Sequence, residues 1–597
     1  MKSMKLKGAA PLTVLGLLAF VSASVIQAQV TKEQIEAVGA NLRAPQAFYH
    51  NLSPKQRKML SGAALNFFQI VDRWPDLERQ ILAGQLPDFF PTPASSDIKT
   101  GPAPVKVSNP ATDFVYGPSS GFTQSETSTA WCGSNVVVGF NDSGSYWESG
   151  FATTFAHVSL NGWSNSTNQG GSFTDRGYLP SKTANPFNFL EGDPVLACNS
   201  ASTFYYSSLF FTATSLSSLT AISVSSSANG GVSFGAPVIA VSKSAVNHFL
   251  DKDWMAVDPA RPTHIAVTYT DFDFSGTVCG KGIERTAIEL VYSTNAGATW
   301  SKPMVVYQAC DASPNFPSVQ GSQVAFSPSG AVDVAFELFS GGVPTGNQIE
   351  FESAPALGAA FGATVAVANI TFVGDRFALQ GGFRAFIDLQ GMAIDHSSLT
   401  TKGNIYVVYH DAADFVKSFS GVGYGYADVM FTKSTDGGAT WSAPVEVNTA
   451  STLLPVITEP LPSGRGIDSY MPGVAVDNTS GEIGVCWYDR RNDLTNLKVD
   501  RYCADSFTAG ATFTAPATPA ISGRMTPASF SPIHGTDDLI NPTYMGDYDT
   551  VASDTLKTTP GFIGAFQVVV PASPGSCTSV PPCVLVPNSD VVARSFN

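Results

Sequence analysis

Acidic residues recur at equivalent places in this sequence. Four apolar segments end on an aspartate, namely Asp142, Asp271, Asp411 and Asp489. Other acidic residues precede or open segments built on a small residue, such as DWMAVDP at 253–259; they are Glu126, Glu191, Asp193, Asp251, Asp253, Asp468, Asp547 and Asp549. If both kinds of segment end on one face, several carboxylates crowd together, where they raise one another's pKa or hold Ca²⁺ through oxygen ligands. The alternative is that each aspartate caps a strand end within its own unit.

These positions supply the candidates for chemistry. The candidate Ca²⁺ ligands are Asp251, Asp253, Asp271 and Asp547. The candidate catalytic residues are Asp489, Asp253 and Tyr548, the last of which lies in the segment PTYMGDYD. No HExxH or other zinc spacing occurs, and His410 is the one histidine at an equivalent place.

The densest charged run, at 489–493, reads DRRND and directly follows one of the apolar segments. Arginine side chains bind carboxylates with two parallel hydrogen bonds, so Arg490 or Arg491 could grip an acidic sugar. The alternative is a salt bridge within the unit, to Asp489 or Asp493. We take Arg490 and Arg491, with Asp271 and Asp411, as the candidate ligand-binding residues.

A repeat indicates the elements that must position these side chains. The octapeptides STNAGATW at 293–300 and STDGGATW at 434–441 are nearly identical, and related copies end at Phe173, Phe234, Phe361 and Phe513. The six copies lie 61 to 80 residues apart. A fixed period of this kind is the signature of a repeat architecture.

Between the copies, β-branched and aromatic segments alternate with segments built on a shared alanine, which occurs seven times. Each unit then reads as four antiparallel strands, and four-stranded units recurring every ~70 residues describe the blades of a β-propeller. We therefore predict an all-β propeller over residues 119–597, with seven blades favoured by the alanines and six as the alternative.

The repeat resembles the Asp box of the sialidase (neuraminidase) superfamily. The residues that carry the resemblance are Ser293, Asn295, Gly297, Thr299 and Trp300 in one copy and Ser434, Asp436, Gly438, Thr440 and Trp441 in another. The resemblance implies a turn at the periphery of each blade. We predict that both tryptophans are buried between blades and that Asn295 and Asp436 bond to the backbone of their turns. It also implies a site with three arginines, an aspartate acid/base and a tyrosine nucleophile assisted by glutamate. The sequence departs from that site, because it has no arginine between Arg79 and Arg176.

The N-terminal part differs from the repeats. Residues 1–28 have the basic, apolar and small-residue order of a secretory signal, residues 29–85 have helical spacing, and residues 86–118 read as a Pro- and Ser-rich linker. No later stretch is apolar enough to span a membrane. Eight cysteines in an exported chain favour disulfides between neighbours in the sequence, with Cys486 to Cys503 foremost and Cys577 to Cys583 at the C-terminus.

Charge narrows the class of partner. The chain of 597 residues has a net charge of −15, which becomes −18 when the three lysines of the leader are removed. This balance disfavours nucleic acids and anionic membranes. It leaves two functions open: an exported hydrolase or lyase acting on a polysaccharide or glycoconjugate, and a non-catalytic binding or scaffold propeller. Counting ionised aspartates at the mouth of the ring, we expect a neutral or Ca²⁺-bridged glycan and no high-affinity recognition of sialic acid.

Overall fold

The computed structural model describes residues 104–109, 121 and 123–596, with gaps in the last range. The gaps are 154, 215–216, 313–316, 341–344, 372–378, 380–386, 418–422, 449–467, 494–496, 515–522, 527–528, 532–544 and 571–587. Scattered helical and bend residues between 46 and 79 are also described. The predicted signal sequence, most of the predicted helical segment and the pair Cys577 and Cys583 lie outside the described residues.

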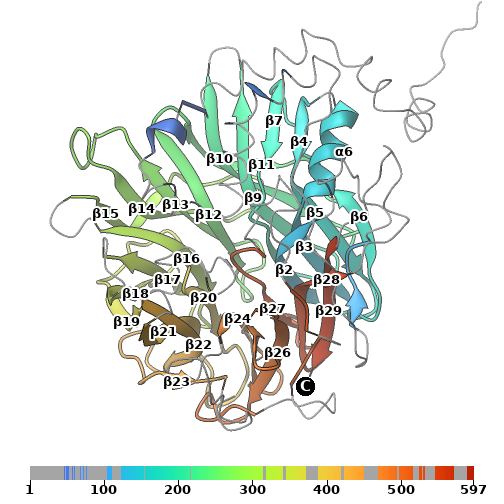
Figure 1. Ribbon diagram of the computed structural model, residues 1–597, viewed down its shortest axis with the longest axis vertical. Coiled ribbons are helices and arrows are strands. Elements are labelled where there is room, and N and C mark those ends of the chain that lie inside the picture. The colour runs from blue at the N-terminus through green and yellow to red at the C-terminus, as the bar shows by residue number, and fades with distance from the viewer. Residues whose placement is uncertain are drawn as a thin grey trace, which may run out of the picture.

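Seven β-sheets are arranged as blades around one axis (Figure 1). The prediction of a seven-bladed propeller is thus confirmed, and the six-bladed alternative is wrong. Each of the seven alanines lies on an innermost strand, because apolar residues with small side chains let these strands approach one another around the axis. Within the described residues, no helix is long and apolar enough to cross a membrane.

We name each blade by its innermost strand. From the axis outward, the strands are β2 (Gln124–Cys132), β3 (Asn135–Asp142), β5 (Asn161–Ser166) and β6 (Thr174–Tyr178); β8 (Val195–Cys198), β9 (Phe204–Ala213), β10 (Ser218–Ser227) and β11 (Val238–Ser244); β12 (His248–Val257), β13 (Ile265–Asp273), β14 (Arg285–Ser293) and β15 (Met304–Cys310); β16 (Ser318–Phe326), β17 (Val332–Phe339), β18 (Thr345–Ala354) and β19 (Val365–Thr371); β20 (Leu389–Ile394), β21 (Ile405–Lys417), β22 (Gly423–Ser434) and β23 (Val445–Glu446); β24 (Ser469–Val476), β25 (Ile483–Asp489) and β26 (Asp500–Ser506); β27 (Val551–Ser553), β28 (Phe562–Val570) and β29 (Asn588–Phe596).

The ring is closed by a strand from the beginning of the chain. β1 (Val105–Lys106) pairs antiparallel with β29, with Val105 opposite Ala593. The segment assigned to the linker therefore contributes the outermost strand of the β27 blade. The C-terminal segment DVVARSF, in β29, is the third strand of the same blade. Strands from both ends of the chain therefore pair within one blade.

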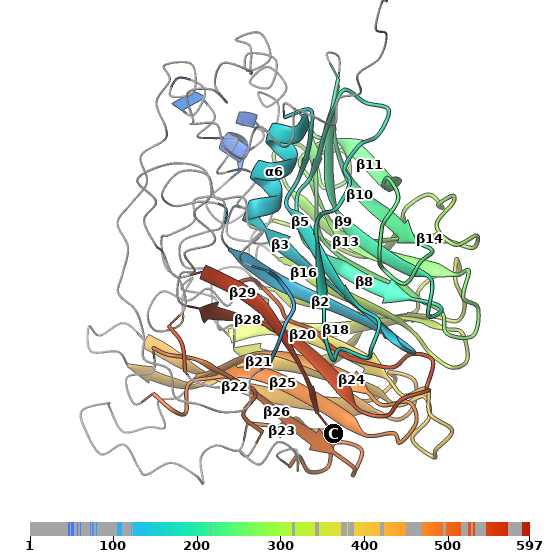
Figure 2. The same ribbon diagram turned by 90° about the vertical axis from the view of Figure 1, so that its right-hand side faces the viewer.

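Additional elements lie beside the β8 blade. β7 (Phe187–Leu190) pairs with the C-terminal part of β9, and β4 (His157–Ser159) pairs parallel with β7. The helix α6 (Ser143–Thr153) begins directly after β3, where the carboxylate of Asp142 accepts hydrogen bonds from the backbone N of Gly144 (2.9 Å) and the hydroxyl of Ser145. Figures 1 and 2 show α6 and the described N-terminal residues at the same, upper end of the molecule. Asp142 thus caps the N-terminus of a helix, which neither interpretation of the strand-end aspartates predicts.

The six copies of the octapeptide form peripheral turns. In the copy at 434–441, Oδ1 of Asp436 accepts hydrogen bonds from the hydroxyl of Ser434 (2.8 Å) and the backbone N of Thr440 (2.9 Å). Asn295 makes the equivalent bonds to Ser293 and Thr299, each 2.9 Å long. The predicted bonds to the backbone of the turn are confirmed.

The aromatic residue of the turn reaches the preceding blade. Trp441 packs edge-on against Phe351 of the β16 blade, with ring centroids 5.5 Å apart, and Phe513 packs in the same way against Phe431 of the β20 blade. Trp300 and Trp441 are half-buried, so the prediction that both are buried between blades is confirmed only in part. The rings lie where the turn leaves the blade, and their outer edges stay in contact with solvent.

Three disulfides join the neighbours in the sequence that we expected to pair. Cys486 and Cys503 lie opposite each other on β25 and β26, and Cys279 pairs with Cys310. Cys132 pairs with Cys198 and links the β2 blade to the β8 blade.

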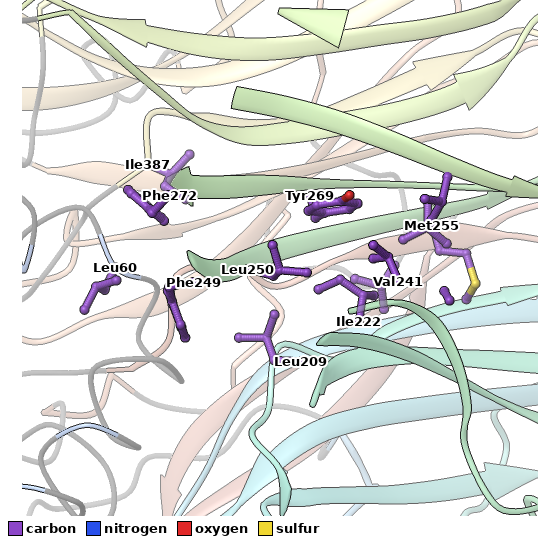
Figure 3. Packing of buried hydrophobic residues seen from close by; sticks show 14 of the residues in the cluster. Leu60, Leu209, Ile222, Val241, Phe249, Leu250, Met255, Tyr269, Phe272 and Ile387 are labelled. Carbon is purple, nitrogen blue, oxygen red and sulfur yellow. The ribbon is translucent and has the colours of Figure 1, made fainter. Parts of the chain in front are cut away.

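The largest apolar cluster extends from the blades to the N-terminal segment (Figure 3). Leu60 lies beside Phe249 at the start of β12, and Phe68 packs against the same ring with centroids 4.9 Å apart. Phe68 also stacks on Tyr49. The N-terminal segment is thus packed on the side of the ring at which β12 begins.

Candidate functional site

The innermost strands share an irregularity at the axis. Strand pairing shifts register between Ser125 and Ser128 in β2, between Asp251 and Trp254 in β12, between Gln320 and Gln323 in β16, and between Tyr470 and Gly473 in β24. In the β8 blade, residues 191–194 interrupt the inner edge between β7 and β8. Each interruption contains a residue with positive φ, and in four of them this residue has a side chain: Glu126 (53°), Asp193 (53°), Lys252 (49°) and Met471 (52°).

A positive φ costs a residue with a side chain on the order of 1–3 kcal/mol, and it persists only where the surroundings enforce it. We call Glu126, Asp193, Lys252, Asp253 and Tyr548 the axial cluster. Three of its members carry that strained backbone, and they come from three consecutive blades. Such strain concentrates at functional sites, so the axial cluster is the first place to look for chemistry.

Hydrogen bonds hold the carboxyl of Glu126 in place. Its Oε1 accepts from the backbone N of Asp547 (2.9 Å), and its Oε2 accepts from Nδ2 of Asn141 (2.7 Å). Oδ1 of the same asparagine accepts from the backbone N of Asp193 (3.1 Å). Gly546 makes room for this arrangement, because a Cβ there would lie 2.6 Å from Cγ of Glu126. Glu126 and Asp193 are therefore positioned by one shared side chain.

Burial favours the protonated form of two carboxyls of the axial cluster, those of Glu126 and Asp253. Glu126 and Asp193 have no exposed surface, and Asp253 is 1% exposed. Burial raises the pKa of Glu126 well above its usual value, and the charges of Asp193 and Asp547 raise it further. Burial also raises the pKa of Asp253 well above its usual value, against the lowering effect of a hydrogen bond from Ser207. A protonated carboxyl at neutral pH can donate a proton, as a general acid must.

The axial cluster contains one cation and one aromatic face. Nζ of Lys252 lies 3.2 Å from the centroid of the Tyr548 ring. The hydroxyl of Tyr548 donates to the carbonyl of Pro194 (2.9 Å), which fixes the ring. The cluster thus combines proton donors, an ammonium group and an aromatic platform, a set able to orient and protonate a sugar.

A second polar group continues around the axis. His410 is fully buried, and burial lowers its pKa to about 3. Its Nδ1 accepts a hydrogen bond from the backbone N of Met471 (3.2 Å), and its Nε2 lies 2.8 Å from Oδ1 of Asp388. Glu337 in turn accepts hydrogen bonds from the backbone N of Asp388 and Leu389. The neutral imidazole thus ties three blades together.

The predicted aspartates at the strand ends are bound by partners from the same blade or from a neighbouring one. Asp489 accepts from Arg491 (2.8 and 2.6 Å), from the indole of Trp487 (2.8 Å) and from Ser469 (3.0 Å). Arg490 is 1% exposed and pairs with Asp468 at 2.9 Å. The intra-blade salt bridge, which was the alternative for this run, therefore describes Arg491 and Asp489. Oδ1 of Asp411 accepts from the backbone N of Thr371 in the neighbouring blade (2.9 Å).

Asp271 lies in an ion network between two blades. It contacts Nζ of Lys243 (2.8 Å), Nδ1 of His248 (3.0 Å) and Arg285 (3.1 Å). Against the effect of its burial, the hydrogen bond from His248 and the charge of Lys243 hold the pKa of Asp271 below its usual value. Asp271 is therefore ionised and already neutralised.

The candidate Ca²⁺ ligands do not converge. Among the described residues, one group of three His, Cys, Asp or Glu side chains brings its ligand atoms within 4.8 Å of one another: His248, Asp271 and Asp273. Asp251, Asp253 and Asp547 are not part of it, and Asp251 instead accepts a hydrogen bond from Gln320 (2.8 Å). The two basic side chains on Asp271 repel a cation, so the residues present do not fit Ca²⁺.

The structure brings Asp253 and Tyr548, two of the three predicted catalytic candidates, into the axial cluster and keeps Asp489 out of it. Glu126 and Asp193 belong to the acidic positions noted in the sequence. Lys252 was missed, although it lies between two of the aspartates singled out. The signal that could have found it is a basic residue between two acidic ones directly before an inner strand.

No protein-family model matches the sequence, and no curated protein matches it. Solved structures that match include an α-L-arabinanase of Penicillium chrysogenum complexed with arabinobiose, at 11% identity and a TM-score of 0.40 over 66% of this chain and 94% of that chain. A polysaccharide lyase described as an ulvan lyase matches at 10% identity and a TM-score of 0.42 over 81% and 95%. A Hadza microbial sialidase matches at 12% identity and a TM-score of 0.35 over 67% and 70%. Likeness at this level carries no argument about activity, and the fold assignment rests on the strand pairing.

Proposed function

We propose that the chain is an exported carbohydrate-active propeller of the sialidase superfamily, a hydrolase or a lyase, whose reacting groups lie in the axial cluster. The observation that carries the proposal is the strained backbone of Glu126, Asp193 and Lys252 on three consecutive blades. The peripheral repeat supports the superfamily, and the three disulfides support an oxidising compartment.

In this proposal Glu126 is the general acid. Its raised pKa keeps a proton available near neutral pH, and its hydrogen bonds to Asn141 and to the backbone of Asp547 fix the direction of the carboxyl. Asp193 raises that pKa through its charge and becomes the second carboxyl of the pair. Because Glu126 and Asp193 are fully buried, a substrate reaches them only after neighbouring side chains move.

The test is a screen of the mature chain against neutral and acidic polysaccharides. New reducing ends report cleavage, and ultraviolet absorbance of an unsaturated product distinguishes a lyase from a hydrolase. We expect Glu126→Gln to lower turnover at least ~100-fold, as loss of a general acid does. Asp436→Asn is the matched control, because asparagine already occupies the equivalent place at Asn295. Full activity of folded Glu126→Gln would refute the assignment of the acid.

A non-catalytic binding propeller is the second candidate, and one observation favours it. The aspartates at the strand ends are occupied by partners from the ring itself, such as Arg491 on Asp489 and Lys243 on Asp271. This function predicts glycan binding without new reducing ends or unsaturated products in the same screen.

A further inference from the structure

A short segment near the start of the chain lies between the first and the last blade. The side chain of Val107 is buried in an apolar cluster whose other members come from the β2 blade and the β27 blade. Its carbonyl accepts a hydrogen bond from the hydroxyl of Ser164 in the β2 blade (2.7 Å), and its backbone N donates to the carbonyl of Val591 in the β27 blade (2.9 Å). We call residues 105–109 the clasp, because they bind both blades at the point where the ring closes.

Two aspartates, one from each blade, hold the end of the clasp. Oδ2 of Asp175, in β6, accepts a hydrogen bond from the backbone N of Asn109 (2.8 Å). Oδ1 of Asp590, in β29, accepts one from the hydroxyl of Ser108 (3.4 Å), and that hydroxyl accepts from the backbone N of Val591 (2.9 Å). Asp590 is 3% exposed. The contact between the clasp and the β27 blade therefore includes a buried carboxyl.

The charged groups that act on Asp590 are mostly acidic. Asp142, in β3, and Asp175 act on it from the β2 blade, and Lys106 acts on it from the clasp. Glu148, in α6, adds its charge to those of Asp142 and Asp175. Lys106 and Glu148 are exposed, so water and salt screen their charges, whereas Asp142 and Asp590 are buried. Ionisation of Asp590 is therefore opposed both by burial and by the neighbouring carboxylates.

The arginines of the same two strands point to other partners. Nε of Arg176, in β6, donates to the side chain of Asn165 (2.7 Å), and Arg594, in β29, donates to the carbonyl of Met525 (3.2 Å). Tyr178, the remaining titratable side chain of β6, faces Glu148. The exposed Lys106 is thus the cation that acts on Asp590.

Protonation at the clasp changes with pH in a range that natural surroundings cover. Burial raises the pKa of Asp590 to about 7 and that of Asp142 to about 6, and the charge of Asp175 raises both further. The pKa of an aspartate in an unfolded chain is about 4. The stability that protonated Asp590 gives the clasp is therefore complete below about pH 4 and is lost as pH rises through about 7.

We propose that the clasp is an acid-stabilised closure of the propeller, which holds the β2 and β27 blades together in acidic surroundings and detaches from them as the surroundings become neutral. Detachment leaves the outer edge of β29 unpaired. The β27 blade keeps its other strands, because the pairing of β28 with β29 does not involve the clasp. The chain is then suited to an acidic medium, and this inference does not depend on the proposed function.

Hydrogen exchange of the full mature chain tests the proposal. The measured quantity is the protection factor of the backbone amides of residues 105–109, which corrects for the pH dependence of exchange itself, and β13 on a distant blade is the internal reference. Between pH 4.5 and pH 7.5 the protection of the clasp in the wild type should fall at least ~10-fold more than that of β13.

Two variants fix a carboxyl in a neutral form. Asp590→Asn keeps an acceptor for the hydroxyl of Ser108, so its clasp should be protected as in the wild type at pH 4.5 and should stay protected at pH 7.5. Asp142→Asn should act in the same direction with a smaller effect, and asparagine can still cap α6. Asp436→Asn, at an exposed carboxylate in a peripheral turn, is the matched control and should keep the wild-type pH dependence.

Protection of the clasp that does not change with pH would overturn the proposal, and so would an equal fall in the wild type and in Asp590→Asn. An equal fall in β13 would overturn it as well, because the whole ring and not the clasp would then respond to pH. If Ca²⁺ restores the protection at pH 7.5, the carboxyls bind a cation and the proposal is again wrong. If Asp590→Asn does not fold, the wild-type profile and Asp142→Asn still decide.

Discussion

The peripheral turns and the axial interruptions are both repeated around the ring, yet they differ in how their polar groups are used. In the turns, Ser434, Asp436 and Thr440 bond to one another and to the backbone, and the same bonds recur around Asn295. At the axis, the equivalent positions differ from blade to blade, and Nζ of Lys252 makes no hydrogen bond with the residues that the structure describes. A repeat that keeps its residues and satisfies its polar groups serves the fold. A repeat that keeps its backbone and varies its side chains is where function can be placed.

The largest expected effect is at the turns. Gly437 and Gly438 both have positive φ (73° and 89°), but a Cβ at Gly438 would clash with the ring of Phe351, whereas one at Gly437 meets nothing within 4 Å. We expect Gly438→Ala to lower the free energy of unfolding by about 3 kcal/mol or more and Gly437→Ala by about 1 kcal/mol. Equal losses in denaturant titrations of the two variants would show that the turn does not hold the blades together.

The aromatic contact of the same turn should have the next largest effect. Trp441 is half-buried against Phe351, so Trp441→Ala should lower the free energy of unfolding by about 2 kcal/mol, less than for a fully buried ring. Phe507→Ala is the control, because that ring is 71% exposed. If Trp441→Ala leaves the melting temperature unchanged, the aromatic residue of the turn does not contribute to packing between blades.

The pH dependence of the melting temperature tests the groups at the axis, the second of the two regions compared. Burial raises the pKa of Glu191, and its Oε1 has no hydrogen-bond partner. The stability that protonated Glu191 contributes is fully present below the pKa that this residue has in the unfolded chain. It is lost as pH rises through the higher pKa that the residue has in the folded protein. Glu191→Gln mimics the protonated form, so its melting temperature should match the wild type near pH 4 and exceed it by roughly 1–3 °C near pH 8. Parallel pH curves for the two proteins would mean that Glu191 is not held protonated at the axis.

The smallest expected effect is that of a chelator. Lys243 and Arg285 already neutralise Asp271, and the other candidate ligands are not gathered with it. We expect the melting temperature to be the same in chelator and in excess Ca²⁺. If excess Ca²⁺ raises the melting temperature and Asp271→Asn abolishes that rise, Asp271 belongs to a Ca²⁺ site after all.

The sequence predicts the fold because the turns and the shared alanines are local patterns. Ser434 to Trp441 specify one turn within eight residues, and the alanines give the number of blades. β1 escaped prediction because a strand of two residues in a Pro-rich segment carries no periodicity and depends on β29, almost 500 residues away. The partners of Asp271 escaped for the same reason, since Lys243 comes from the neighbouring blade.

The site is predictable only in part, and the reason is strand register. Acidic residues before the inner strands mark the axis correctly, as Glu126, Asp193 and Asp253 show. Which side chain occupies an interruption depends on a register shift between two strands, and no spacing in one strand reveals it. The strand-end aspartates Asp489 and Asp271 are wrong predictions of site residues, because their position at strand ends is visible in the sequence and their partners are not.

Turnover by variants matched for stability tests most directly whether function lies at the axis. The comparison uses the substrate that the polysaccharide screen identifies, with Asp193→Asn at the axis and Asp436→Asn at a turn, each first shown to be folded by its melting temperature. We predict that Asp193→Asn loses at least ~100-fold in kcat and that Asp436→Asn keeps the wild-type value. Wild-type turnover by Asp193→Asn would contradict the account and return the search to the outer surface of the ring.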